Sequence, residues 1–131
     1  PCTRNLIRTT GWIASALLAR QAGVYVGRKR DVTWLYRQHL GDEWADYLDA
    51  LHQECLEAWH YLIPEAPAER ARLRALSRRA RDFERFFLAS YRAFVLEELH
   101  SADPAARAEA LRMLRMTPLR DAEIEMLAAE A

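Results

Sequence analysis

The chain has 131 residues, of which 51% are hydrophobic, and its 19 basic and 19 acidic side chains give a formal net charge of zero. This composition is typical of one globular domain and excludes a largely disordered chain. A neutral chain has no overall attraction to nucleic acid or to an anionic membrane, so we expect neither as a partner. No apolar run approaches the roughly 18 residues that a membrane span requires, and no signal-peptide pattern is present, so we expect a cytoplasmic protein.

Two helices are expected in the first part of the chain. Residues 4–22 place apolar side chains at steps of three or four, which predicts a helix with one apolar face. Thr3 is expected to cap this helix at its start, and Gly23 to end it in the left-handed conformation. After a short basic loop, Asp31 is expected to cap a second helix over residues 32–40.

A third helix is expected over residues 42–62, with Asp42 as its cap. Its apolar side chains recur at alternating steps of four and three, which is typical of a buried seam. The seam consists of Trp44, Leu48, Leu51, Cys55, Ala58 and Leu62. We therefore expect Cys55 to be a buried free thiol, which fits a reducing compartment.

A long helix over residues 69–99 is the element around which the rest is organised. The segment contains no Gly or Pro and repeats apolar side chains every three or four positions, which predicts a helix about 45 Å long. Its first half is rich in Arg, whereas the third helix is acidic. The short connection between them predicts antiparallel packing, with the opposite charges facing each other.

Two short helices are expected to follow. Asp103 and Pro104 are suited to the start of a helix that ends near residue 115, and Thr117-Pro118 repeats this pattern before a helix over about 119–129.

The sequence therefore predicts an all-α, up-and-down bundle of five or six helices with one long central helix. We expect residues 1–131 to form a single helical domain, with its core in residues 4–100 and accessory helices in residues 103–131. If the accessory helices leave the apolar stripe of the long helix uncovered, that stripe is expected to form a homodimer interface.

The basic loop is the first candidate binding site. Arg28, Lys29 and Arg30 are consecutive cations, and such side chains can converge with loop amides on a phosphate group. A solvated loop is the alternative interpretation.

A second candidate site combines an aromatic side chain with carboxylates. Trp34 falls off the apolar face of its helix, and Asp42 and Asp46 follow it on the next one. An aromatic ring beside carboxylates suits an acceptor that carries ammonium groups on a sugar-like ring. Trp44 lies on the apolar seam, where core packing is the expected role.

Several common catalytic motifs are absent from the sequence, including the Walker loop, paired Cys motifs and GxGxxG. His52 and His60 are eight positions apart, too far for a shared metal ion without other ligands. No Arg stands four to seven positions before any of the four His residues, which argues against a helical ribonuclease.

Residues 5–40 resemble the helical C-terminal domain of the aminoglycoside nucleotidyltransferases, in particular the streptomycin and spectinomycin adenylyltransferases and their uncharacterised relatives. In that family a helix ends at a Gly, and an extended loop, a Lys and a helix with a Trp follow. The elements that match here are Leu17-Leu18 to Gly23, residues 24–26, Arg28 or Lys29, and Trp34. Residues 83–87 are similar to the family's last long helix, so the likeness covers about the first hundred residues.

The resemblance implies a helical substrate-binding or lid domain that contacts nucleotide phosphates and a small-molecule acceptor. In the family, a separate domain with a Gly-Ser turn and an Asp-x-Asp pair holds Mg²⁺ and the nucleoside triphosphate. This sequence has no Gly-Ser pair followed by Asp-x-Asp. We therefore expect no catalytic residue, no metal site and no cofactor in this chain. It would act only with a nucleotidyltransferase catalytic domain, in the same protein or on a separate subunit.

Two further functions stay open at this point. A non-enzymatic, dimerising helical bundle could sense a ligand, as in a transcription regulator, or bind another protein. A stand-alone partner of the antitoxin or toxin type is the other alternative.

Overall fold

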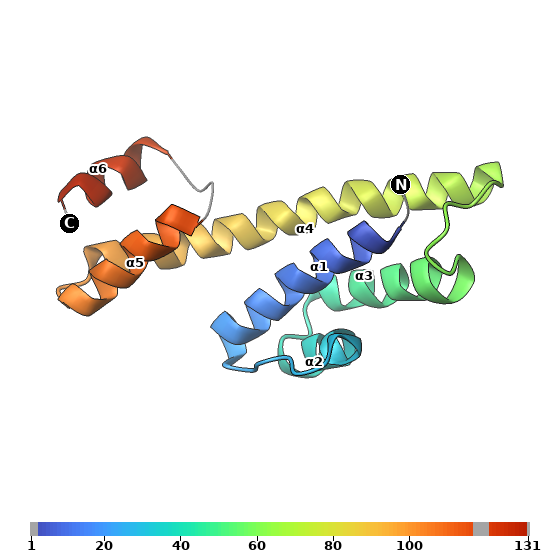
Figure 1. The fold of residues 1–131 in the computed structure, drawn as a ribbon, viewed down its shortest axis with the longest axis horizontal. Helices are drawn as coiled ribbons and strands as arrows, with labels where there is room; N and C mark the ends of the chain where they lie inside the picture. The colour runs from blue at the N-terminus through green and yellow to red at the C-terminus, as the bar shows by residue number, and fades with distance from the viewer. Residues whose placement is uncertain (1–2, 117–120, 131) are drawn as a thin grey trace. The chain divides into compact units, whose positions relative to one another are not determined.

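The computed structural model describes residues 3–116 and 121–130 (Figure 1). Its helices are α1 (Arg4–Leu17), α2 (Val32–His39), α3 (Glu43–His52), α4 (Pro67–His100), α5 (Pro104–Met116) and α6 (Ala122–Glu130). Two π-helical segments, η1 (Leu18–Ala22) and η3 (Gln53–Ala58), continue α1 and α3, and a 3-10 turn, η2 (Lys29–Asp31), leads into α2. The described residues contain no strand, so the predicted all-α class with one long helix is confirmed.

The chain divides into two compact units, Pro1–Arg85 and Phe86–Ala131. The boundary falls within α4, so the first part of this helix belongs to the first unit and the remainder to the second. No described helix combines the length and the apolar character needed to cross a bilayer.

Two of the expected helix caps do not form. Thr3 has helical backbone angles (φ −73°, ψ −7°) and makes no side-chain capping bond. Asp31 is also in a helical conformation, because η2 runs directly into α2, and it makes no capping bond either. Its carboxylate accepts hydrogen bonds from Arg28 and Trp34 instead. A side-chain cap requires an extended residue before the helix, and neither position provides one.

The other caps agree with the sequence. Asp42 is extended (φ −84°, ψ −173°), and its carboxylate accepts a hydrogen bond from the backbone N–H of Trp44. Asp103 accepts one from the N–H of Ala105 at the start of α5. Gly23 ends the first helix in the left-handed conformation, with a φ of 66°. Thr117 and Pro118 lie outside the described residues.

The third helix is shorter than the sequence predicts. It ends with η3 at Ala58 rather than at Leu62, and Leu62 is 69% exposed instead of lying on the seam. His60 and Tyr61 both adopt positive φ angles (48° and 65°), which turns the chain away from the helix. The N–H of Tyr61 donates to the carbonyl of Cys55 (2.7 Å) and so satisfies one of the last helical acceptors.

The core of the first unit is built from α1, α2, α3 with η3, and the first part of α4. Phe83 of α4 is fully buried and contacts the rings of Trp44 and Tyr47, which lie on α3. Tyr36 of α2 is also fully buried and packs edge-on against Phe83. Cys55 is a buried free thiol, as predicted; Cys2 lies outside the described residues.

Helices α3 and α4 are antiparallel within the first unit, as the charge pattern predicts. Glu43 at the start of α3 pairs with Arg79 of α4, whereas Glu54, later in the chain, pairs with Arg72, which is earlier in α4. Between these two pairs, the hydroxyl of Tyr47 donates to the backbone carbonyl of Leu76 (2.8 Å). The guanidinium of Arg79 also lies 4.2 Å from the centroid of the Trp44 ring.

The second unit has its own small apolar core. Side chains from the end of α4 and from α5 and α6 form it: Val95, Leu99, Ala110, Leu114 and Ile124. Arg92 of α4 joins α6 to this unit, because it pairs with Asp121 (2.6 Å) and Glu123 (2.9 Å) at the start of that helix. The short Ala-rich helices are therefore packed elements of this unit.

Candidate functional site

A groove in the first unit is the candidate site. It has a volume of about 750 Å³, which lies within the range of small-molecule pockets, and α1, the start of α2, α3 and η3 form its walls. Figure 1 shows α1 alongside α3, with α2 near the end of the pair. The N–H of Thr3 donates to the carbonyl of Tyr61 (3.0 Å), which ties the start of α1 to the end of the α3–η3 segment.

Four cationic side chains line the groove. Arg4 and Arg8 are one turn apart on α1, and Lys29 and Arg30 come from η2. All four residues are exposed, and the lining includes no Asp or Glu. Within residues 3–116 and 121–130, no carboxylate forms an ion pair with any of the four. The groove is therefore cationic, although the chain as a whole is neutral.

The inner lining of the groove is apolar. Buried or half-buried aliphatic side chains contribute most of it: Ile7, Val32, Leu48, Leu51 and Leu56. Trp12 lines the groove from α1 and is 72% exposed. The lining hydroxyls of Thr10 and Ser15 donate to carbonyls of their own helix, so they add little polarity.

Gly11 leaves space on the α1 wall. A Cβ atom at this position would meet no heavy atom within 4 Å, so the space beside Gly11 is open. Glycine inside a helix costs about 1 kcal/mol relative to alanine. No close approach of another segment requires glycine at this position.

Irregular backbone borders the groove at the end of η3. Leu56 belongs to a π-helical segment, and Tyr61 has a positive φ without being a glycine. Such features carry strain and often occur at binding sites. Arg4 stacks over the Tyr61 ring at 5.2 Å, so this turn also positions one of the groove cations.

The three cations predicted to bind phosphate separate into two environments. Lys29 and Arg30 line the groove. Arg28 does not, and its guanidinium pairs with Asp31 at 3.1 Å, with the side chain 67% exposed. The structure therefore brings two of the three together with Arg4 and Arg8, and it leaves Arg28 in a local ion pair.

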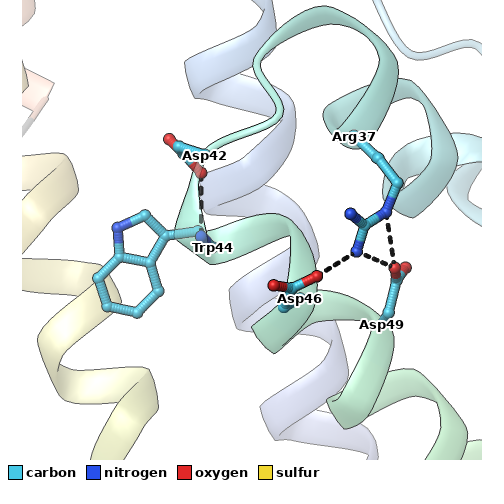
Figure 2. A network of polar contacts seen from close by, with 5 residues as sticks. All are labelled: Arg37, Asp42, Trp44, Asp46 and Asp49. Carbon is cyan, nitrogen blue, oxygen red and sulfur yellow. Dashed lines mark hydrogen bonds and ion pairs between the residues drawn. The ribbon is translucent and has the colours of Figure 1, made fainter.

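The residues predicted to bind the acceptor do not come together in one pocket. Trp34 is 53% exposed, and its indole N–H donates to Asp31 (3.2 Å). Figure 2 shows Asp42 at the start of α3, where it bonds to the N–H of Trp44, and Asp46 one turn later, held by Arg37. None of these three predicted residues lines the groove.

Arg37 of α2 binds two carboxylates of α3. Its guanidinium contacts Asp46 (2.7 Å) and Asp49 (2.6 Å), as the dashed lines in Figure 2 show. The hydrogen bonds that Arg37 donates to Asp46 and Asp49 raise the pKa of Arg37 above its ordinary value. These two carboxylates are therefore already partnered with a cation and hold α2 against α3.

Sequence reasoning missed Arg4, Arg8 and Trp12 as site residues, although the signal was present. They recur every four positions and therefore lie along one side of α1. His52 is half-buried on the opposite wall, in agreement with its interpretation as a surface or half-buried histidine and not a metal ligand, but the sequence did not indicate that it lines a groove. Within the described ranges, no three His, Cys, Asp or Glu side chains are close enough to hold a metal ion.

Neither a protein-family model, nor a curated protein, nor a solved structure matches this chain.

Proposed function

We propose that this chain is the helical substrate-binding or lid domain of a nucleotidyltransferase, and that it contacts the phosphates of a nucleotide. The observation that carries the proposal is the position of Lys29 and Arg30 on a groove that also contains Arg4 and Arg8 but no carboxylate. Four cations without acidic partners create a positive potential that attracts a phosphate group. The resemblance of residues 5–40 to the aminoglycoside nucleotidyltransferases supports a nucleotide as the source of that phosphate.

The chemistry of transfer would come from a separate catalytic domain. That domain would supply Mg²⁺ and bind the nucleoside triphosphate, and this chain would position the bound molecules. Lys29 and Arg30 are the residues proposed for phosphate contact, with Arg28 as an outer cation of the same loop. For acceptor contact, Trp34 is the proposed residue whose ring face is open, because it is 53% exposed and only its indole N–H is bonded, to Asp31. Asp42 and Asp46 are proposed too, although their carboxylates already accept hydrogen bonds within the domain.

The test begins with the natural gene product. Its intact mass and the sequence before Pro1 should reveal an α/β domain with a Gly-Ser turn and an Asp-x-Asp pair, or a separate subunit that carries them. The assembled enzyme should then transfer a nucleotide to small-molecule acceptors. A product that begins near Pro1 and has no catalytic partner would remove the case for transferase chemistry.

The phosphate contact is tested in the same assembly. The double variant Lys29→Gln, Arg30→Gln should weaken nucleotide binding about tenfold or more, since each charge-assisted hydrogen bond contributes about 1.5–3 kcal/mol. Arg74→Gln, Arg78→Gln is the matched control, because it removes the same charge from exposed α4 residues that do not line the groove. Equal losses in the two variants would show only a general charge effect.

A second candidate function is a non-enzymatic helical bundle that senses a ligand, with or without dimerisation. The mostly apolar lining of the groove favours this candidate, because such a site can bind a small molecule without a catalytic domain. Sedimentation of the purified chain with and without ligand tests it. A ligand-dependent change in oligomeric state would support a sensor.

A further inference from the structure

We propose that the groove of the first unit selects a small amphipathic anion, in which one anionic group is attached to an apolar body. The inference rests on the proposed function only in taking the groove as a ligand site, and it names the class of ligand that the groove accepts. The anionic group would lie beside Arg8, Lys29 and Arg30, and the apolar body would cover Leu51 and Leu56.

The positive charge of the groove indicates that the ligand is negatively charged. Its cations have no carboxylate among the lining residues, whereas other arginines of the first unit, such as Arg37 and Arg79, are paired with acids. A cationic ligand would meet only like charges in this groove. Arg8 donates one hydrogen bond to the side-chain oxygen of Asn5 (2.8 Å), which is neutral. An anion would accept charge-assisted hydrogen bonds from the remaining N–H groups of the four cations.

The apolar inner surface of the groove indicates that the remainder of the ligand is apolar. A bare phosphate or pyrophosphate needs polar donors around it, but the inner lining is aliphatic, and its Thr10 and Ser15 hydroxyls donate to their own helix. Desolvating a compact polyanion against such a surface is unfavourable, whereas covering it with an apolar body is favourable. Trp12 adds an exposed aromatic face at the edge of the groove, and the absence of a side chain at Gly11 leaves space beside it.

The electrostatics also argue against a polycationic acceptor in this groove. An aminoglycoside would place several ammonium groups near Arg4, Arg8, Lys29 and Arg30 without a carboxylate to receive them. The ligand class inferred from the groove therefore differs from the drug class in the name of the family that the sequence resembles.

The test uses two fluorescent probes with the same apolar body. Anilinonaphthalene sulfonate carries one anionic group, and N-phenylnaphthylamine is its uncharged counterpart. The intact chain should bind the sulfonate saturably at one site and about tenfold or more tightly than the uncharged probe. Inorganic pyrophosphate has charge but no apolar body. Its dissociation constant, measured by displacement of the sulfonate, should be at least about tenfold higher than the dissociation constant of the sulfonate.

Two variants test the two halves of the ligand separately. Arg8→Gln, Lys29→Gln should weaken sulfonate binding about tenfold or more, and Arg74→Gln, Arg78→Gln should leave it unchanged. Gly11→Leu places a side chain in the groove without removing a cation, so it should weaken both probes and spare pyrophosphate. Leucine favours helix more than glycine does, and circular dichroism will confirm that each variant is folded.

The outcomes separate this inference from the proposed function. Equal affinity for the two probes, or no effect of either groove variant, would overturn the inference. Pyrophosphate binding as tight as that of the sulfonate and dependent on Lys29 would also overturn it, while leaving the phosphate site of a nucleotidyltransferase intact. If both groove variants weaken sulfonate binding as expected, and the natural gene product has no catalytic domain, the inference is supported and the transferase function is refuted.

Discussion

The hydroxyl of Tyr36 donates a hydrogen bond to Oδ2 of Asp42 at 2.9 Å, and so joins the buried face of α2 to the first turn of α3. The other oxygen of the same carboxylate accepts the bond from the N–H of Trp44 that caps α3. Burial and the neighbouring carboxylate both raise the pKa of Tyr36 far above its ordinary value, so the phenol stays protonated as the donor. Asp42 therefore has a structural role in connecting these helices.

Replacing Asp42 should destabilise the fold. Asp42→Ala removes the cap of α3 and leaves the buried Tyr36 hydroxyl without its acceptor, which should lower the free energy of unfolding by about 1–3 kcal/mol. Asp42→Asn keeps an acceptor oxygen and should cost less than Asp42→Ala. Urea denaturation of the three proteins measures both values, and equal stability of Asp42→Ala and the parent would contradict this role.

Phe83 should be the most sensitive core position on α4. It has no exposed surface and contacts three aromatic rings, those of Tyr36, Trp44 and Tyr47. Phe83→Ala should lower the free energy of unfolding by about 3–5 kcal/mol, because the transfer and cavity terms add. Phe86→Ala removes the same ring from an exposed position and should cost much less. The ratio of these two losses in chemical denaturation is the measurement.

Cys55 should be a poorly reactive thiol. Burial is the main reason that its pKa rises to about 11, so almost no thiolate exists near neutral pH. In a Cys2→Ser background, a disulfide reagent at pH 8 should label Cys55 only as fast as the protein opens. Labelling as fast as for a free thiol in solution would contradict the burial of Cys55.

The same pKa shift has a consequence for stability. The pKa of Cys55 is higher in the folded chain than in the unfolded one. The buried thiol therefore makes its full contribution to folding stability below the unfolded pKa of about 8.5. This contribution is lost as the pH rises through about 11. A Cys55→Ala variant should lose less stability than the parent over this alkaline window.

Arg92 should control the attachment of α6 within the second unit. Hydrogen bonds from Arg92 are the main reason that the pKa of Asp121 falls below its ordinary value. Ionised Asp121 therefore stabilises the folded chain above the unfolded pKa of Asp, about 3.9. This stabilisation is lost as the pH falls through the lower pKa that Asp121 has in the folded chain. Arg92→Gln should raise the pKa of Asp121 and speed amide exchange in α6 near neutral pH.

The charge-matched control for this prediction is Arg85→Gln, on an exposed side chain of the first unit that pairs only with Asp82 among the described residues. It should leave amide exchange in α6 unchanged. Equal protection of α6 in Arg92→Gln and the parent would mean that the apolar core around Ile124 holds this helix alone.

Much of the fold could be read from the sequence because helical periodicity is a local property. The steps of three and four that mark residues 4–22 and 69–99 place apolar side chains on one face whatever the helices later contact. The buried positions of Trp44 and Cys55 follow from the same pattern, and both were predicted correctly. Gly23 and Asp42 were also predicted correctly, because a left-handed helix end and a capping bond involve neighbouring residues. The same reasoning failed at Thr3 and Asp31, whose backbone is helical and makes no cap.

The site could not be read in the same way, because ion pairs depend on distances between segments far apart in the chain. The sequence offered Arg28, Lys29 and Arg30 as equals, and only the packing of α2, with η2 before it, against α1 placed two of them on the groove with Arg4 and Arg8. The sequence also suggested Asp46 as a ligand contact, but in the structure α2 packs against α3 and its Arg37 forms an ion pair with this carboxylate. The sequence alone therefore determined which helices form and which faces they bury. Only the tertiary structure decided which charges are neutralised and which remain available to a ligand.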